Sequence, residues 1–273
     1  MVKGSVVMTV WNRDHDLLLA VFRQLRRSLP DDWEVVVVDD GSTADYSGVK
    51  QLTEQVGPKC RWIETGEYEA FRICGGFNNP ARAFNVGVEA AEGETLLILS
   101  SDVLVKPKLF QRLAMAGGEG LYTPGVIDID TGMQYCGPLR VFPMPWCLGT
   151  TKKAVTEAGG WDEAYLQGLC YEDNDFVGRL ALIQGRVLAD WDTVVYHMSH
   201  EQPAYNLKDP DVMAANERNR RLTIAKWRGV PFDQAQSPFD VLRGPHPSGL
   251  IAYECKAQPG VLEGAMPKGV TVS

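Results

Sequence analysis

Two short apolar runs, each followed by acidic residues, constrain the fold of this chain more than any other feature. Residues 35–38 are four consecutive valines that lead into Asp39, and residues 96–99 lead through two serines into Asp102. A strand that is apolar at every position has both faces buried, which is typical of a parallel sheet with helices on each side. Ligands of such open sheets bind beyond the carboxyl ends of the strands. Asp102 is therefore expected at the edge where this class of fold does its chemistry.

The segments around these runs alternate between strand and helix patterns. Residues 5–11 predict a first strand, and residues 14–28 carry apolar side chains three and four positions apart, which predicts an amphipathic helix. Residues 44–56 predict a second helix and residues 60–63 a third strand. The resulting order of strand, helix, strand, helix and strand indicates a parallel sheet covered by helices.

The rest of the chain departs from this strict alternation. Residues 64–78 predict a loop, after which Asn79, Pro80 and Gly93 suit the cap, the first turn and the end of a helix. Residues 126–135 predict an antiparallel hairpin. Further helices are expected over residues 108–116, 150–158, 172–184 and 211–226, and further strands near residue 121 and over residues 185–191 and 193–196.

Charge, hydropathy and cysteine spacing argue against a nucleic-acid-wrapping protein, a membrane-spanning protein and a disulfide-rich or zinc-binding protein. A net charge of -8 and a pI near 5.1 disfavour a protein that wraps the nucleic acid backbone, which requires a basic face. No run approaches the roughly 18 apolar residues of a membrane span, and the apolar part of the N-terminus is too short for a signal peptide. The six cysteines form no Cys-x-x-Cys pair, so we expect reduced thiols in a cytoplasmic protein, without disulfides or zinc.

Three groups of segments together resemble the family 2 glycosyltransferases. The first joins residues 6–12 to residues 35–42, the second covers residues 81–102, and the third joins residues 159–163 to residues 171–176. Each motif alone is common, and their order and spacing carry the resemblance. It implies the GT-A fold, an α/β architecture in which helices flank a Rossmann-like, mostly parallel central sheet. A small antiparallel hairpin region is expected on the acceptor side.

The resemblance also implies a division of the chain. Residues 1–229 would form the GT-A domain, with a nucleotide-sugar-binding half over residues 1–116 and an acceptor and catalytic half over residues 117–229. Residues 230–273 are rich in proline and glycine and predict an extended tail, packed on the domain or on a second subunit of a homo-oligomer.

A family 2 enzyme moves a sugar from a nucleotide diphosphate sugar to a hydroxyl group, and here UDP is the favoured carrier. Trp11 offers a stacking face for the base and Asp39 an acceptor for its edge, although core packing and turn formation are the ordinary roles of these residues. Arg82 and Asn85 begin a helix whose N-terminus favours anions, unless they are a solvated first turn. The predicted donor site comprises Thr9, Trp11, Asp39, Arg82, Asn85, Ser101 and Asp102.

The family binds a divalent cation at an Asp-x-Asp motif, which falls here on residues 100–102. Ser100 replaces the first acid, and only Asp102 remains. The resemblance implies Mn²⁺ or Mg²⁺ at Asp102, acting as a Lewis acid on phosphate oxygens. His197 and His200 follow the last predicted strand and are the expected additional ligands; the choice between them is open, and His197 is slightly favoured because it lies closest to the strand. The alternative is that Asp102 only caps the following turn.

The resemblance places catalysis on two adjacent acids. Asp173 is the expected general base for the acceptor hydroxyl of an inverting transfer, and Glu172 is expected to bind the acceptor or support the base. The ordinary alternative is that acidic residues simply favour a helix N-terminus. Trp161 and Asp162 are predicted to shape the acceptor pocket.

Two other classes of function share part of this pattern. A non-catalytic GT-A domain that binds nucleotide-sugar or glycan is suggested by Ser100, although the acids at 172, 173 and 175 argue for catalysis. A nucleotidyltransferase or dinucleotide oxidoreductase would need a glycine-rich loop after the first strand, where this chain has Trp11, Asn12 and Arg13. The acceptor stays open between glycan, lipid, protein and modified nucleic acid.

Overall fold

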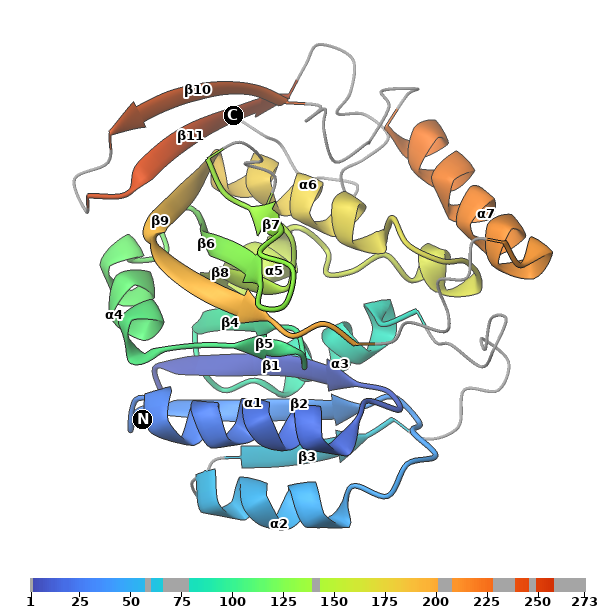
Figure 1. The fold of residues 1–273 in the computed structure, drawn as a ribbon. Helices are drawn as coiled ribbons and strands as arrows, with labels where there is room; N and C mark the ends of the chain where they lie inside the picture. The colour runs from blue at the N-terminus through green and yellow to red at the C-terminus, as the bar shows by residue number, and fades with distance from the viewer. Residues whose placement is uncertain are drawn as a thin grey trace.

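The protein is built on one mixed sheet. The computed structural model describes residues 2–56, 60–65, 79–138, 143–200, 208–227, 239–245 and 249–257. Within them, the 11-stranded sheet has the order β10-β11-β9-β6-β8-β4-β1-β2-β3, with β5 paired to β9 and β7 to β6 (Figure 1). Its strands are β1 (Gly4–Val10), β2 (Trp33–Asp39), β3 (Cys60–Glu64), β4 (Thr95–Leu99), β5 (Val103–Leu104), β6 (Leu121–Asp128), β7 (Gln134–Cys136), β8 (Cys147–Thr151), β9 (Arg186–His197), β10 (Phe239–Pro245) and β11 (Ile251–Ala257).

The N-terminal half of the sheet is the parallel unit that the sequence predicts. β1 lies between β2 and β4 and runs parallel to both, and β3 runs parallel to β2. The α/β fold with a Rossmann-like parallel sheet is therefore confirmed. Because parallel strands end at the same edge, the residues that follow β1, β2 and β4 meet at one side of the sheet.

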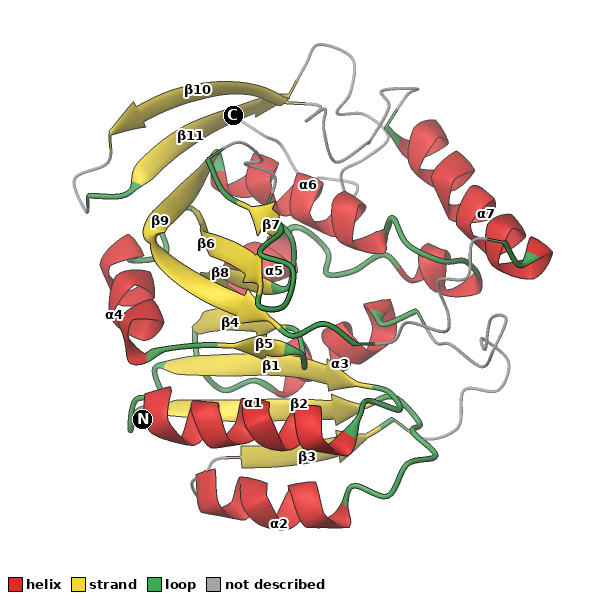
Figure 2. Ribbon diagram, viewed as in Figure 1, coloured by secondary structure: helices red, strands yellow, loops and turns green. Residues whose placement is uncertain are grey.

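Helices cover both faces of the sheet, as Figure 2 shows. Side chains of β1 alternate between two cores: Val6 and Met8 pack with Phe22, whereas Val7 packs with Phe84 on the opposite face. The helices are α1 (His15–Ser28), α2 (Ser47–Val56), α3 (Ala81–Ala90), α4 (Pro107–Ala116), α5 (Lys152–Glu157), α6 (Glu172–Gln184) and α7 (Pro210–Lys226), with a 3₁₀ helix η3 at Glu163–Gln167. The helices expected from the apolar periodicity are thus present.

Gly93 has a different role from the helix end predicted for it. α3 ends at Ala90 and is capped by Ala91. A Cβ atom at position 93 would lie 2.5 Å from the Cα atom of Gly4. The glycine is therefore required where the chain passes directly over the start of β1 on its way into β4.

The C-terminal half of the sheet differs from the prediction in three places. β8 was not predicted, yet it lies in the sheet between β4 and β6, where a helix was expected to begin at residue 150. The two strands predicted over residues 185–191 and 193–196 form the single strand β9. The tail is not simply extended, because β11 pairs with β9 and β10 pairs with β11. The division at residue 229 remains a prediction.

Two further expectations concern thiols and membranes. Among the described residues, the cysteines at positions 60, 136, 147, 170 and 255 carry free thiols. None of the helices in the described part of the chain combines the length and apolar character that a membrane span requires. The loop predicted over residues 64–78 lies largely outside the described residues.

Candidate active site

Backbone hydrogen bonds hold Asp102 and His197 next to each other. After β4 the chain turns through Ser101 and Asp102, both buried, into the two-residue strand β5. β5 pairs antiparallel with the end of β9, with Val103 opposite His197. The N–H of Met198 donates to the carbonyl oxygen of Asp102 at 2.8 Å. The sheet therefore fixes the separation of two predicted ligands that lie far apart in the sequence.

The side chains of Asp102, His197 and His200 form one cluster. The Asp102 Oδ2 atom lies 2.9 Å from His200 Nε2 and 3.8 Å from His197 Nε2. One ligand atom from each of the three residues lies within 4.8 Å of the other two. The second carboxylate oxygen of Asp102, Oδ1, is buried without a hydrogen-bond partner among the described residues. A buried acceptor left open beside two imidazoles fits a divalent cation.

Arg13, which was not predicted from the sequence, also contacts this cluster. Its guanidinium lies 3.2 Å from Asp102 Oδ2, 3.3 Å from Ser101 Oγ and 2.5 Å from His200 Nε2. Burial alone would raise the pKa of Asp102, but the His200 hydrogen bond and the Arg13 charge lower it to about 2. Arg13 is the third residue after the end of β1, so the parallel pairing of β1 with β4 was the signal that could have identified it.

The two predicted catalytic acids lie at the N-terminus of α6. Glu172 is buried and accepts a hydrogen bond from Asn79 Nδ2 at 2.9 Å. Asp173 accepts from Trp161 Nε1 at 3.3 Å. Burial raises the pKa of both carboxyl groups, and the charge of Asp173 raises that of Glu172 further. Raised pKa values in neighbouring acids are what a site needs to keep one acid neutral and one available as a base.

Unusual backbone conformations occur just before Arg13 and just before Glu172. Within the described ranges, the non-glycine residues with positive φ are Asn12 (43°), Cys170 (62°) and Tyr171 (70°). Asn12 precedes Arg13, and the other two residues precede Glu172. Such conformations cost free energy and cluster at functional sites, because the surrounding structure must hold them.

Trp161 is a buried support for Asp173. Its ring stacks between Phe84, at 4.6 Å, and Phe176, at 3.5 Å between ring centroids. The Asn85 amide accepts from the Trp161 N–H at 2.8 Å and donates to the Trp161 carbonyl oxygen at 2.9 Å. Asn85, predicted to contact the nucleotide, thus has polar contacts with the backbone that carries this indole. The acceptor role predicted for Trp161 would act through Asp173.

We expect Trp161→Phe to move the acid limb of the pH–activity profile to higher pH. A general base is active when ionised, so activity should rise as the pH increases through the pKa of Asp173, about 6 in the intact protein. The indole hydrogen bond stabilises the ionised carboxylate, and its loss raises that pKa. Measuring kcat/KM against pH tests this expectation.

Trp191→Phe is the matched control for this substitution. The Trp191 Nε1 atom is buried without a hydrogen-bond partner among the described residues, so its removal should leave the acid limb in place. An unchanged limb in Trp161→Phe, or an equal movement in both variants, would contradict the role given to the Trp161 hydrogen bond.

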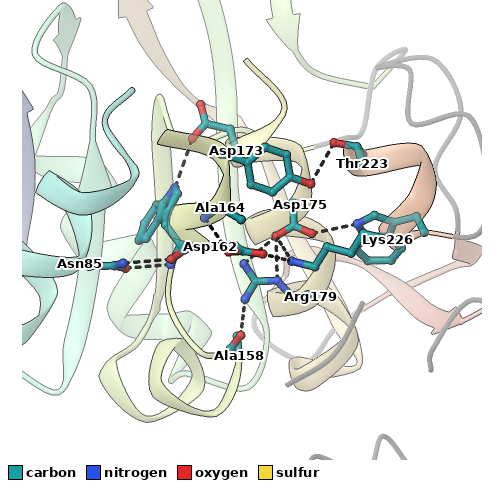
Figure 3. A network of polar contacts seen from close by, with 12 residues as sticks. Asn85, Ala158, Asp162, Ala164, Asp173, Asp175, Arg179, Thr223 and Lys226 are labelled. Carbon is teal, nitrogen blue, oxygen red and sulfur yellow. Dashed lines mark hydrogen bonds and ion pairs between the residues drawn. The ribbon is translucent and has the colours of Figure 1, made fainter. Parts of the chain in front are cut away.

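Ion pairs centred on the buried Asp175 connect α6 with α7 and with the segment before η3 (Figure 3). Asp175 Oδ2 lies 2.8 Å from Arg179 Nη2 and 2.8 Å from Lys226 Nζ, and Asp175 Oδ1 accepts from Trp227 Nε1 at 3.0 Å. Lys226 also pairs with Asp162 at 2.8 Å. Asp162 additionally caps η3. The network therefore ties the end of α7 to the helix that carries the two acids.

The other predicted donor-site residues lie along the edge where the parallel strands end. Asp39 is buried at the end of β2, and its Oδ1 accepts from the Ser42 N–H at 3.0 Å, as the turn-forming alternative requires. Thr9 lies in β1 opposite Val38. Trp11 directly follows β1, and Arg82 lies in the first turn of α3, both half-buried. Contact of these residues with a nucleotide remains a prediction.

Comparison with known proteins gives a sequence match to part of the chain. Residues 5–123 match the family model described as glycosyl transferase family 2. Over 112 residues the chain is 36% identical to the uncharacterised glycosyltransferase alr2836 of Nostoc sp. strain PCC 7120, which covers 41% of this chain. The chain spans only 31% of the length of that relative.

Solved structures extend the likeness to most of the fold. TarS 1-349 of S. aureus in complex with UDP-GlcNAc has a TM-score of 0.63 at 16% identity, covering 85% of this chain and 68% of that one. GalNAc-T7 with UDP, GalNAc and Mn²⁺ has a TM-score of 0.61 at 13% identity, covering 85% and 53%. At 16% and 13% identity, these likenesses show the fold alone. The chain has the GT-A fold, and its residues 5–123 match the family model of glycosyl transferase family 2.

Proposed function

We propose that the protein is an inverting glycosyltransferase that moves a sugar from a UDP-sugar to an acceptor hydroxyl group. The observation that supports the proposal is the presence, in one fold, of a possible metal site and of two adjacent acids with raised pKa values. An Asp-His-His cluster lies after β4 and at the end of β9, and the buried Glu172 and the half-buried Asp173 lie at the start of α6. The first suits a charged leaving group and the second suits proton transfer.

The donor end of the proposal rests on the cluster around Asp102. Arg13 brings positive charge to this cluster, and the N-terminus of α3 would add N–H dipoles that favour a diphosphate. A divalent cation held by Asp102 and the two histidines would act as a Lewis acid on the leaving phosphate oxygens. Two imidazoles with one carboxylate suit Mn²⁺ better than Mg²⁺, which prefers oxygen ligands. UDP is favoured as carrier because the TarS and GalNAc-T7 structures hold UDP or a UDP-sugar.

The acceptor end rests on Asp173. The acceptor oxygen attacks the anomeric carbon, the bond from that carbon to the diphosphate oxygen breaks, and the hydroxyl proton passes to Asp173. UDP leaves with the bonding electron pair, and a single displacement inverts the anomeric configuration. Glu172, kept neutral by burial and by the neighbouring charge, accepts a hydrogen bond from Asn79 and would bind the acceptor or support the base.

A survey of UDP-sugars with added Mn²⁺ tests the function. We expect release of UDP from at least one sugar donor in the presence of Mn²⁺, and loss of that release when EDTA removes the metal. UDP is measured by a coupled assay, and binding of UDP is measured separately by calorimetry. Asp102→Asn is the matched variant, because it keeps the size of the side chain and removes the carboxylate charge. It should lose release to the same extent as EDTA treatment.

Two outcomes would redirect the proposal. UDP-sugar binding without release under any metal, with any acceptor, would favour the non-catalytic GT-A domain, for which Ser100 and the Arg13 contact with Asp102 are the supporting observations. Release that is unaffected by EDTA and by Asp102→Asn would retain the transferase and remove the metal from its mechanism.

A further inference from the structure

The two ring nitrogens of His197 face two different carboxylates. Its Nε2 lies 3.8 Å from Asp102 Oδ2, toward the cluster described above. Its Nδ1 lies 3.1 Å from Asp128 Oδ2, at the end of β6. Both His197 and Asp128 are buried, and the sheet pairs them in register. His197 is thus held between two acids from different strands.

The chemistry of a carboxylate decides which nitrogen of His197 carries the proton. A carboxylate only accepts hydrogen bonds, so the bond to Asp128 requires a proton on Nδ1. In the neutral ring Nε2 then keeps its lone pair, and that lone pair lies on the side of Asp102. Histidines that bind metals in proteins almost always donate their other N–H to a carboxylate, a carbonyl or water.

The two carboxylate oxygens of Asp128 have separate roles. Oδ1 accepts from the backbone N–H groups of Asp130 and Thr131, at 3.2 and 2.8 Å, and from the Thr131 hydroxyl at 2.8 Å. These bonds form the β6–β7 turn. Oδ2 accepts from His197 Nδ1 and from the Ser199 hydroxyl, at 3.1 and 2.8 Å, and from the Tyr135 hydroxyl at 3.5 Å. Substitutions can therefore separate the turn from the contact with His197.

We propose that Asp128 is a positioning residue of the metal site, which fixes His197 in the tautomer that presents Nε2 as a ligand atom beside Asp102. The inference rests on the proposed function, in which that cluster binds a divalent cation. It also separates the two histidines, because both ring nitrogens of His200 lie near Arg13 Nη1, at 3.1 and 2.5 Å. His197 is the ligand whose second ring nitrogen, Nδ1, is hydrogen-bonded to a carboxylate outside the cluster, that of Asp128.

Asp128→Asn is expected to weaken Mn²⁺ binding about 10- to 100-fold, the usual effect of losing a partner behind a metal ligand. The asparagine Oδ1 still accepts from the turn. Its Nδ2 group donates to His197 Nδ1, which forces the proton onto Nε2 and removes the ligand lone pair. Mn²⁺ binding is measured on the full chain without nucleotide, by the electron paramagnetic resonance signal of free Mn²⁺.

Thr131→Val is the matched control, because it removes a hydroxyl contact to Oδ1 and leaves the Oδ2 contact with His197 intact. It should bind Mn²⁺ as the unmodified protein does. An equal loss of affinity in Thr131→Val and Asp128→Asn would mean that Asp128 acts through the turn, and would overturn the proposal.

The tautomer of His197 is measured independently in the metal-free protein. Long-range ¹H–¹⁵N spectra, assigned with His197→Gln, should show a proton on Nδ1, and Asp128→Asn should move it to Nε2. A proton on Nε2 in the unmodified protein would overturn the proposal even if Asp128→Asn does not fold. Failure of the unmodified protein to bind Mn²⁺ is a different result, which overturns the metal in the proposed function and the positioning role with it.

Discussion

Asp173→Asn is expected to lower the turnover number about 10²- to 10⁴-fold, the range that a positioned general base contributes. Asparagine keeps the shape of the side chain and can still accept from Trp161 Nε1, so the local packing is retained. It cannot take the proton of the acceptor hydroxyl. Initial rates of transfer measure the effect, and the KM for the UDP-sugar should change little because the donor site is untouched.

Glu172→Gln is the matched substitution for this test. Burial and the neighbouring charge raise the pKa of Glu172, so the glutamate is mostly neutral near pH 7 and glutamine reproduces that state. We therefore expect a much smaller loss in Glu172→Gln than in Asp173→Asn. The reverse order of effects would assign the base to Glu172 instead.

Asp175→Asn is expected to lower the free energy of unfolding by about 3–5 kcal/mol, the usual result of removing one partner of a buried ion pair. The carboxylate of Asp175 is fully buried and lies at 2.8 Å from both Arg179 and Lys226. Asparagine has nearly the same volume, so the loss comes from leaving buried positive charge without its partner. Denaturation in urea, compared at equal slopes, measures it.

Glu217→Gln provides the comparison for stability. Glu217 pairs with Arg220 and Arg221 at 2.6 and 2.8 Å, but these residues lie on the exposed side of α7. Water screens such pairs, so this variant should unfold at nearly the same urea concentration as the unmodified protein. Equal behaviour of the two variants would show that the Asp175 network contributes little to stability.

The parallel half of the fold was predictable because the sequence pattern of each segment is enough to identify that segment as a strand or a helix. Four consecutive valines fill β2 whatever their neighbours are, and the apolar spacing of α1 identifies its buried face. β8 was not predictable in the same way. It is a five-residue strand with Gly149 at its centre, and it is strand-like only because β4 and β6 pair with it from both sides.

The break predicted within β9 has a physical explanation. Acidic residues are disfavoured in strands, and the break between the two predicted strands falls on Asp192. In the structure Asp192 is exposed, so its carboxylate stays in water. The register of β6 against β9 shifts at this point, where Pro124 lies opposite Asp190 and Gly125 opposite Val194, and β9 continues through it as one strand.

The residues of the candidate site also fall into two groups, those that a local motif predicts and those that depend on which strands pair. The residues carried by motifs were predicted from the sequence, including Asp102, His197 and Asp173. Arg13 and Asp128 were not, because their proximity to the cluster depends on which strands become neighbours. Asp128 had been assigned only to a hairpin, and its pairing with His197 arises from the parallel contact between β6 and β9.

The cluster of Asp102, His197 and His200 can form during folding only once β9 has taken its place in the sheet. Residues 5–123 carry the family match, yet His197 and His200 arrive only with the end of β9, and Asp102 and His200 are separated by 98 positions in the chain. Closing so long a loop is entropically costly and slow, so contacts of this kind form late. In refolding experiments, Mn²⁺ binding is therefore expected to appear only after β9 has joined the sheet. Binding of the metal would then report that the sheet is complete.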